Sequence, residues 1–122
     1  MEIIFQFGTL EVKADFNKSN SAQVIAAALP IKSVVNCWGD EIYFEIPVKL
    51  PPENATLDLK VGDIGYWPEG ACLCLFFGKT PASVDERPRP ASEVNIVGRF
   101  STHPAALRKV VSGVQAQIFK KK

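Results

Sequence analysis

At 122 residues, with 47% hydrophobic and 22% charged residues, the chain has the length and composition of one globular domain, residues 1–122, built around a single core. Its 14 basic and 13 acidic residues leave a formal net charge of +1, too small a field to attract nucleic acid or an anionic membrane. The composition therefore argues against nucleic acid and membranes as partners.

Apolar and polar residues alternate along the first part of the chain. Ile3, Phe5 and Phe7 share one face of a strand, and after Gly8 the alternation continues through residues 10–14. A period of two is typical of a strand with one buried face, so the sequence predicts a β-hairpin over residues 3–14.

Residues 19–29, SNSAQVIAAAL, have a different character. Ser and Asn at the start can cap a helix, the alanines favour one, and Pro30 ends it. We therefore expect one short amphipathic helix after the hairpin. Its apolar stripe is predicted to consist of Val24, Ile25, Ala28 and Leu29.

Two strands are predicted next, over residues 34–37 and 41–46. The turn between them contains Gly39, which can adopt the positive φ that a tight turn requires. The proline-containing residues 47–56 are expected to form a loop.

Residues 57–61 alternate again and predict a further strand, with Leu57, Leu59 and Val61 on one face. The following residues 62–65 contain two glycines and are typical of a turn. Next comes ACLCLFF, residues 71–77, which is apolar on both faces. Such a strand is expected in the middle of a sheet, covered on one side by the barrel interior and on the other by a helix or groove.

Residues 78–93 form a long segment rich in proline and charge, which exceeds the usual connection length and predicts either a functional lid or a solvated loop. Residues 94–100 predict another strand. Residues 101–110 predict a short helix with a Ser or Thr cap and an early proline, and residues 114–118 predict a last strand.

The predicted elements amount to about eight short strands and two short helices, which most simply form a mainly β protein, a closed barrel capped by the two helices, because closure removes exposed sheet edges. A β-sandwich with a helical lid is the structural alternative.

Three long blocks of sequence carry a family resemblance: SVVNCWGDEIYFEIPV, GDIGYWPEGACLCLFFGKTPAS and RPASEVNIVGRF, which together cover most of residues 33–100. They resemble the signature blocks of the small bacterial and archaeal cyclophilin-like family of uncharacterised proteins. The resemblance implies the cyclophilin fold, an eight-stranded barrel closed by two helices.

Cyclophilins are prolyl isomerases, so the resemblance raises that activity, which needs an apolar pocket for the proline ring and an Arg that weakens amide resonance. The cyclophilin motif S-Q-F-F-I resembles residues 74–78, where Phe77 keeps the pocket aromatic but Leu75 replaces the peptide-binding Gln. The motif H-V-V-F-G-K-V resembles residues 94–100, where Val94 replaces the His. EIYFEIPV offers no Arg, and the expected Trp is missing from residues 79–93.

The remaining hypothesis is an aromatic groove, because Tyr and Trp combine apolar area with a polar tip. The alternative is that these aromatic residues fill the barrel ends. The arginines of the 78–93 segment, Arg87 and Arg89, either clamp an anion or keep the loop solvated, and Asn95 pairs either with loop backbone or with a ligand. The ligand-binding candidates are Trp38, Tyr43, Tyr66, Trp67, Leu75, Phe77, Thr80, Arg87 and Asn95.

Three cysteines and one histidine supply the atom types of a zinc site: Cys37, Cys72, Cys74 and His103. The C-x-C spacing on a strand lacks the tight turn of most structural zinc sites, so the cysteines are better interpreted as small buried hydrophobic residues. The sequence predicts no metal, no cofactor and no catalytic residue. An odd number of cysteines and a start without a signal-peptide pattern predict a cytoplasmic protein.

These observations favour a non-catalytic binding module that recognises a small molecule or a proline-containing peptide segment. The first alternative is a divergent prolyl isomerase, in which Arg87, Arg89 or Arg99 replaces the missing Arg. The second is an interaction subunit of a larger complex, which an exposed apolar patch would favour.

Overall fold

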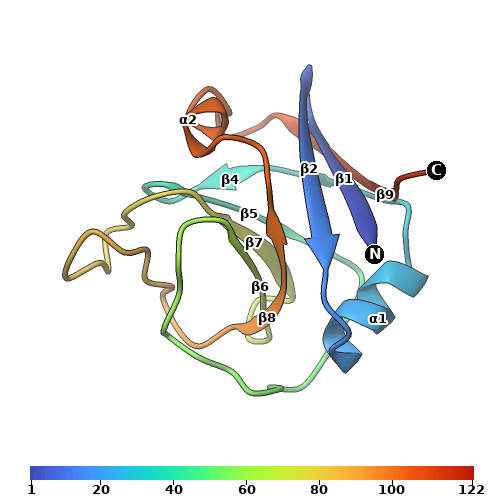
Figure 1. Cartoon of the computed structure of the whole chain (residues 1–122), viewed down its shortest axis with the longest axis horizontal. Coiled ribbons are helices and arrows are strands. Elements are labelled where there is room, and N and C mark those ends of the chain that lie inside the picture. The colour runs from blue at the N-terminus through green and yellow to red at the C-terminus, as the bar shows by residue number, and fades with distance from the viewer.

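The computed structural model describes residues 1–122 and contains one nine-stranded sheet that curls into a nearly closed barrel (Figure 1). Neighbouring strands pair in the order β3-β9-β1-β2-β8-β6-β7-β5-β4, and every pair is antiparallel. The elements are β1 (Glu2–Phe7), β2 (Leu10–Phe16), α1 (Asn20–Ala27), β3 (Ile31–Val34), β4 (Asn36–Cys37), β5 (Glu41–Glu45), β6 (Asp63–Trp67), β7 (Cys72–Phe76), β8 (Asn95–Phe100), α2 (Pro104–Leu107) and β9 (Gln115–Lys120).

The two edge strands of the sheet, β3 and β4, are consecutive in the chain, so a single segment brings the barrel edges together. Val35 separates them, is fully buried, and donates its N–H to the Val114 carbonyl at 2.9 Å. The Ser33 hydroxyl donates to the Glu45 carbonyl at 2.6 Å and ties β3 to β5. The predicted strand over 34–37 is therefore divided at Val35, and the barrel has nine strands and is nearly closed, not eight-stranded and closed.

Aromatic side chains fill the barrel interior. The ring centroids of Phe5 lie 6.0 Å from Phe7, 6.4 Å from Phe16 and 6.2 Å from Phe44. Alternation places these residues on the inward faces of β1, β2 and β5, as the period of two predicts. The hairpin predicted over residues 3–14 is confirmed as β1 and β2.

Helix α1 lies at the opposite end of the barrel from α2 (Figure 1). The Ser19 side chain accepts the Ala22 N–H at 3.1 Å, which confirms the predicted cap. The predicted apolar stripe is half correct: Ile25 is buried and Leu29 packs against the core, whereas Val24 and Ala28 are exposed. The small side chains of this helix lie against the barrel instead, since they allow a close approach. The buried residues are Ser21, Ala22, Ile25 and Ala26.

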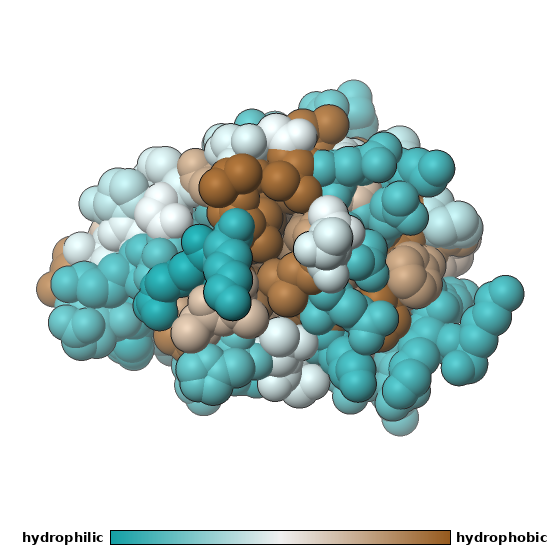
Figure 2. All heavy atoms as spheres, turned by 90° about the horizontal axis from the view of Figure 1, so that it is seen from above, coloured by the Kyte–Doolittle hydropathy of each residue, from teal (hydrophilic) through white to brown (hydrophobic).

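Helix α2 is one short turn whose Leu107 is buried in the main core. Its cap is His103, whose Nδ1 accepts the Ala105 N–H at 3.1 Å. The predicted Ser or Thr cap is wrong because the Thr102 hydroxyl accepts the Lys13 N–H instead. Figure 2, which views this end from above, shows apolar atoms gathered there and surrounded by hydrophilic ones. Neither helix has the length and apolar composition that a membrane-crossing helix requires.

The predictions of a strand over residues 57–61 and a turn over 62–65 are wrong. Residues 57–61 form no strand, and the isolated bridge between Thr56 and Val94 lies just before them. The expected turn over 62–65 instead contains the start of β6 at Asp63. Only Leu59 of the three alternating residues is buried, because this segment packs over the outside of the sheet. β6 pairs with both β7 and β8. The pairing with β8 has a register shift between Ile64 and Gly65.

Gly98 provides a test of how closely β2 and β8 approach each other. A Cβ at this position would lie 2.2 Å from the Asp15 carbonyl oxygen and 3.0 Å from the Phe16 Cα, both of which are backbone atoms. We expect Gly98→Ala to lower the free energy of unfolding by about 2 kcal/mol, as measured by urea denaturation, because two paired strands must move apart.

The control is Gly8→Asn in the exposed β1–β2 turn. The φ of Gly8 is +60°, a conformation that Asn tolerates, and a Cβ there would meet only Val114 at 3.4 Å. Equal losses of stability in the two variants would contradict close strand approach as the reason for the glycine at position 98.

Candidate functional site

The outer face of β5, β6, β7 and β8 carries a second apolar cluster that is separate from the barrel core. Strand β7 is buried along its whole length, with Leu73 and Leu75 facing the barrel interior and Cys72, Cys74 and Phe76 facing outward. The outer cluster consists of Leu59, Cys72, Cys74, Phe76 and Val94, against which Tyr43, Trp67 and Ile96 pack.

Residues 47–62 cover one part of this cluster and are held by polar contacts to the barrel. The Glu53 carboxylate accepts the Ser21 hydroxyl at 2.6 Å and the Ser21 N–H at 2.8 Å, which ties the loop to the start of α1. The Asn95 side chain accepts the Glu53 N–H at 2.8 Å and donates to the Ser21 hydroxyl and the Pro51 carbonyl, each at 3.1 Å. Buried Asn95 thus satisfies loop backbone, the first of its two predicted roles.

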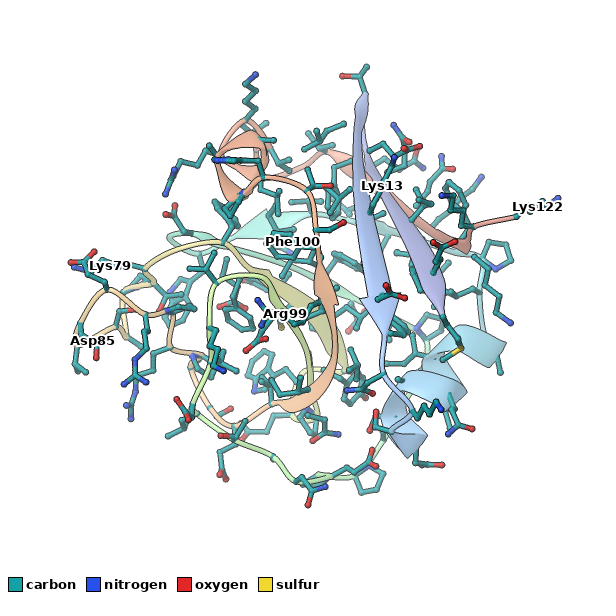
Figure 3. The ribbon with its side chains drawn as sticks, in the orientation of Figure 1. Lys13, Lys79, Asp85, Arg99, Phe100 and Lys122 are labelled. Carbon is teal, nitrogen blue, oxygen red and sulfur yellow. The ribbon has the colours of Figure 1, made fainter.

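Residues 77–94 cover the other part and contain no strand or helix, as the sequence predicts for 78–93. The segment projects from the barrel, and Lys79 and Asp85 mark its outer part (Figure 3). Internal hydrogen bonds fix it: the Thr80 hydroxyl donates to the Arg89 carbonyl, and the Ser83 hydroxyl donates to the Arg87 carbonyl. The Trp67 indole N–H donates to the Ser92 hydroxyl, which joins the segment to the end of β6.

Between the sheet and this segment lies a pocket of about 260 Å³, which we call the aromatic pocket. Three half-buried aromatic side chains converge on it from separate elements: Trp38 from the β4–β5 turn, Tyr43 from β5 and Trp67 from β6. Its complete lining is Trp38, Glu41, Tyr43, Trp67, Cys74, Pro90, Ala91, Ser92 and Val94.

Glu41 is the charged residue in this lining. It is only 6% exposed, and its Oε1 has no hydrogen-bond partner. Burial, partly offset by a hydrogen bond with the Cys74 thiol, raises the pKa of Glu41 to about 7. Its position is fixed by two backbone hydrogen bonds with Trp38, at 2.9 and 3.2 Å, which also hold that indole at the pocket.

The two cysteines near the pocket are weak nucleophiles. Burial raises the pKa of the Cys74 thiol well above its ordinary value, and the nearby Glu41 carboxyl raises it further. Burial likewise raises the pKa of Cys72. Both thiols therefore stay protonated near neutral pH, and the thiolate that nucleophilic chemistry requires is not formed. Cys37 contacts the Val110 carbonyl and His103 caps α2, so neither side chain lies with Cys72 and Cys74.

A larger hollow of about 920 Å³ lies on the other side of the barrel, around Leu29, Phe119 and the C-terminal lysines. Its polar walls are exposed side chains, among them Lys13, Lys120 and Lys121. We favour the aromatic pocket as the functional site, despite its smaller volume, because all but one of its lining residues, the exposed Ala91, are buried or half-buried.

Of the predicted site residues, the structure brings Trp38, Tyr43 and Trp67 together. It places Tyr66, Leu75 and Phe77 inside the barrel, where the Tyr66 hydroxyl donates to the Val48 carbonyl at 2.7 Å. These three side chains face away from the pocket because side chains alternate between the two faces of a strand. Thr80 and Arg87 also lie outside the pocket, with Arg87 paired to Asp58 and Asp85.

Sequence reasoning missed Glu41. An outward-facing Glu next to Tyr43 and Glu45 looks like an ordinary solvated residue. The available signal was the neighbouring segment ACLCLFF, because a strand that is apolar on both faces requires a covered outer face. A carboxylate on the paired strand then lies under that cover, as the pairing of Glu41 with Phe76 shows.

Comparison with known proteins supports the fold over the whole chain. A family model described as Cyclophilin-like matches residues 1–119. The solution structure of the hypothetical protein AF2241 from Archaeoglobus fulgidus is similar with a TM-score of 0.84 and 38% identity, covering 99% of this chain and 95% of that one. The structure of McbB in complex with tryptophan has a TM-score of 0.72 and 15% identity, covering 98% of this chain but 44% of McbB. No curated protein matches the chain.

The buried carboxyl of Glu41 predicts a specific dependence of stability on pH. The pKa of Glu41 is about 7 in the folded protein and 4.5 in the unfolded chain, so folding favours the protonated carboxyl. The contribution of Glu41 to the free energy of unfolding is fully present below about pH 4.5. It is lost as the pH rises through about 7, and the total loss is up to ~3 kcal/mol.

Urea denaturation of the wild type and Glu41→Gln at pH 5 and pH 8 measures this effect. From pH 5 to pH 8 we expect the free energy of unfolding to fall more for the wild type than for Glu41→Gln, because Gln has no proton to lose. Glu45→Gln, an exposed position on the same strand, serves as the control and should follow the wild type. Parallel pH profiles for wild type and Glu41→Gln would contradict a buried titrating carboxyl.

Proposed function

The chain belongs to the cyclophilin-like family, and from that premise we propose that it is a non-catalytic binding module whose aromatic pocket holds a small organic molecule. The observation that carries the proposal is the convergence of Trp38, Tyr43 and Trp67 from three elements around one cavity. Their rings offer large apolar areas at little conformational cost, which is typical of binding sites.

The size of the pocket favours a small ligand. Its volume of about 260 Å³ lies near the lower limit of known ligand sites and fits a ring with a short substituent. McbB, which shares the fold, is known in complex with tryptophan, a molecule of this size class. At 15% identity this likeness concerns the fold, and the matched part amounts to 44% of McbB, so the tryptophan complex is a precedent for McbB itself.

The isomerase alternative has less support. It requires a guanidinium beside an apolar pocket that contains Phe77, and Phe77 is a core residue. Arg99 extends from β8 (Figure 3) and pairs with Asp63 at 2.6 Å. Arg87 pairs with Asp58 and Asp85, while Arg89 lines other hollows. The aromatic pocket has no arginine in its lining, so the binding function is the better-supported proposal.

Two-dimensional NMR of labelled protein with indole as the probe tests the pocket. We expect indole to shift the side-chain N–H signals of Trp38 and Trp67. Trp67→Ala should weaken binding about tenfold, since one aromatic contact is worth ~1 kcal/mol and additional apolar area is lost.

The control variant is Phe119→Ala, which removes an aromatic ring from the larger hollow and should bind indole like the wild type. The proposal fails if Phe119→Ala loses binding while Trp67→Ala retains it. Adding an Ala-Pro peptide to the same samples tests the alternative, because cis/trans exchange peaks that appear only with protein would establish an isomerase.

A further inference from the structure

We infer that the ligand of the aromatic pocket is a small organic cation, an aromatic or apolar body that carries a protonated amino group, and that the Glu41 carboxylate accepts its N–H donors. The inference rests on the proposed function and adds the charge of the ligand and the residue that selects it.

The charge of the pocket lining favours a cation. Glu41 is its one acidic residue, and the lining contains no Lys, Arg or His. The remaining side chains are aromatic, apolar or neutral and polar, with the Cys74 thiol kept protonated by burial, which raises its pKa. A carboxylate in such surroundings creates a negative potential, which favours a cation and repels an anion.

The Glu41 carboxylate also has an unpaired acceptor oxygen. Oε1 of Glu41 is shielded from water and accepts no hydrogen bond from the protein. A buried acceptor without a partner costs ~1–3 kcal/mol, and more when it is charged. An ammonium group is acceptor-free and carries up to three N–H donors, so it would supply the missing partner and the opposite charge together.

The aromatic wall of the pocket also suits a cation. The faces of Trp and Tyr rings attract cations, and the attraction grows when the cation is removed from water. Trp38, Tyr43 and Trp67 line the same pocket as Glu41. An ammonium held at Glu41 would therefore lie among groups that all favour positive charge, while the attached ring would occupy the apolar space beside Pro90 and Val94.

Three probes that share one ring system separate the charge of the ligand from its shape: tryptamine is cationic, 3-ethylindole is neutral and indole-3-propionate is anionic. Binding is measured by NMR titration at pH 8. Glu41, whose pKa is raised by burial to about 7, is mostly ionised there, and tryptamine keeps its proton because alkylamines have pKa values of about 10. We expect tryptamine to bind at least tenfold more tightly than 3-ethylindole, and indole-3-propionate to bind weakest.

Glu41→Gln keeps the shape of the side chain and removes its charge, so in this variant tryptamine and 3-ethylindole should bind with similar affinity. Glu11→Gln, an exposed position on β2, is the control for net charge and should keep the preference for tryptamine. The comparison of probes within the wild type stands even if Glu41→Gln fails to fold.

The possible failures are distinguishable. If 3-ethylindole binds as tightly as tryptamine, the inference is overturned while the proposed pocket stands, and Glu41 is then a protonated structural group paired with Cys74. If tryptamine keeps its preference in Glu41→Gln, the residue assignment is overturned. If none of the three probes shifts the Trp38 and Trp67 signals, the proposed function fails for this class of ligand and the inference fails with it.

Discussion

The structure depends on one constraint, which is that strand β7 is apolar on both faces. Its inward side chains complete the barrel core, and its outward side chains Cys72, Cys74 and Phe76 must also be removed from water. Neither helix covers this face, since α1 and α2 lie at the ends of the barrel (Figure 1). Two long loops provide the cover instead, and the pocket is the space between the sheet and the second of them, residues 77–94.

Much of the barrel could be predicted from the sequence, because period-two alternation is strong where one face of a strand is buried. β2 and β9 follow it throughout, and β1 and β5 follow it except at Ile4 and Glu41, which are also buried. Prediction failed at β6, since Gly65 interrupts the alternation and β6 is buried on nearly every side, whereas the loop residues 57–61 alternate by chance. A strand between two partners is defined by long-range pairing, which local pattern does not contain.

The site was predicted only in part for the same reason. Where both faces of a strand are apolar, the sequence does not indicate which residues face inward. Leu75 and Phe77 therefore could not be distinguished from outward residues such as Cys74. Tyr66 and Trp67 are adjacent and aromatic, yet one faces the core and the other the pocket. The role of Glu41 depends on a loop about fifty residues away in the chain, so it follows only from the folded arrangement.

One wall of the pocket belongs to the barrel and the other to residues 90–92, which contribute nothing to the sheet ladder. Fold and specificity are thus encoded in separate stretches of the chain. Substitutions or insertions in the loop can change the shape of the pocket without disturbing a strand, while Glu41 and the aromatic rings are retained by the scaffold. Such a division lets one barrel diversify its ligands through a segment that belongs to no strand.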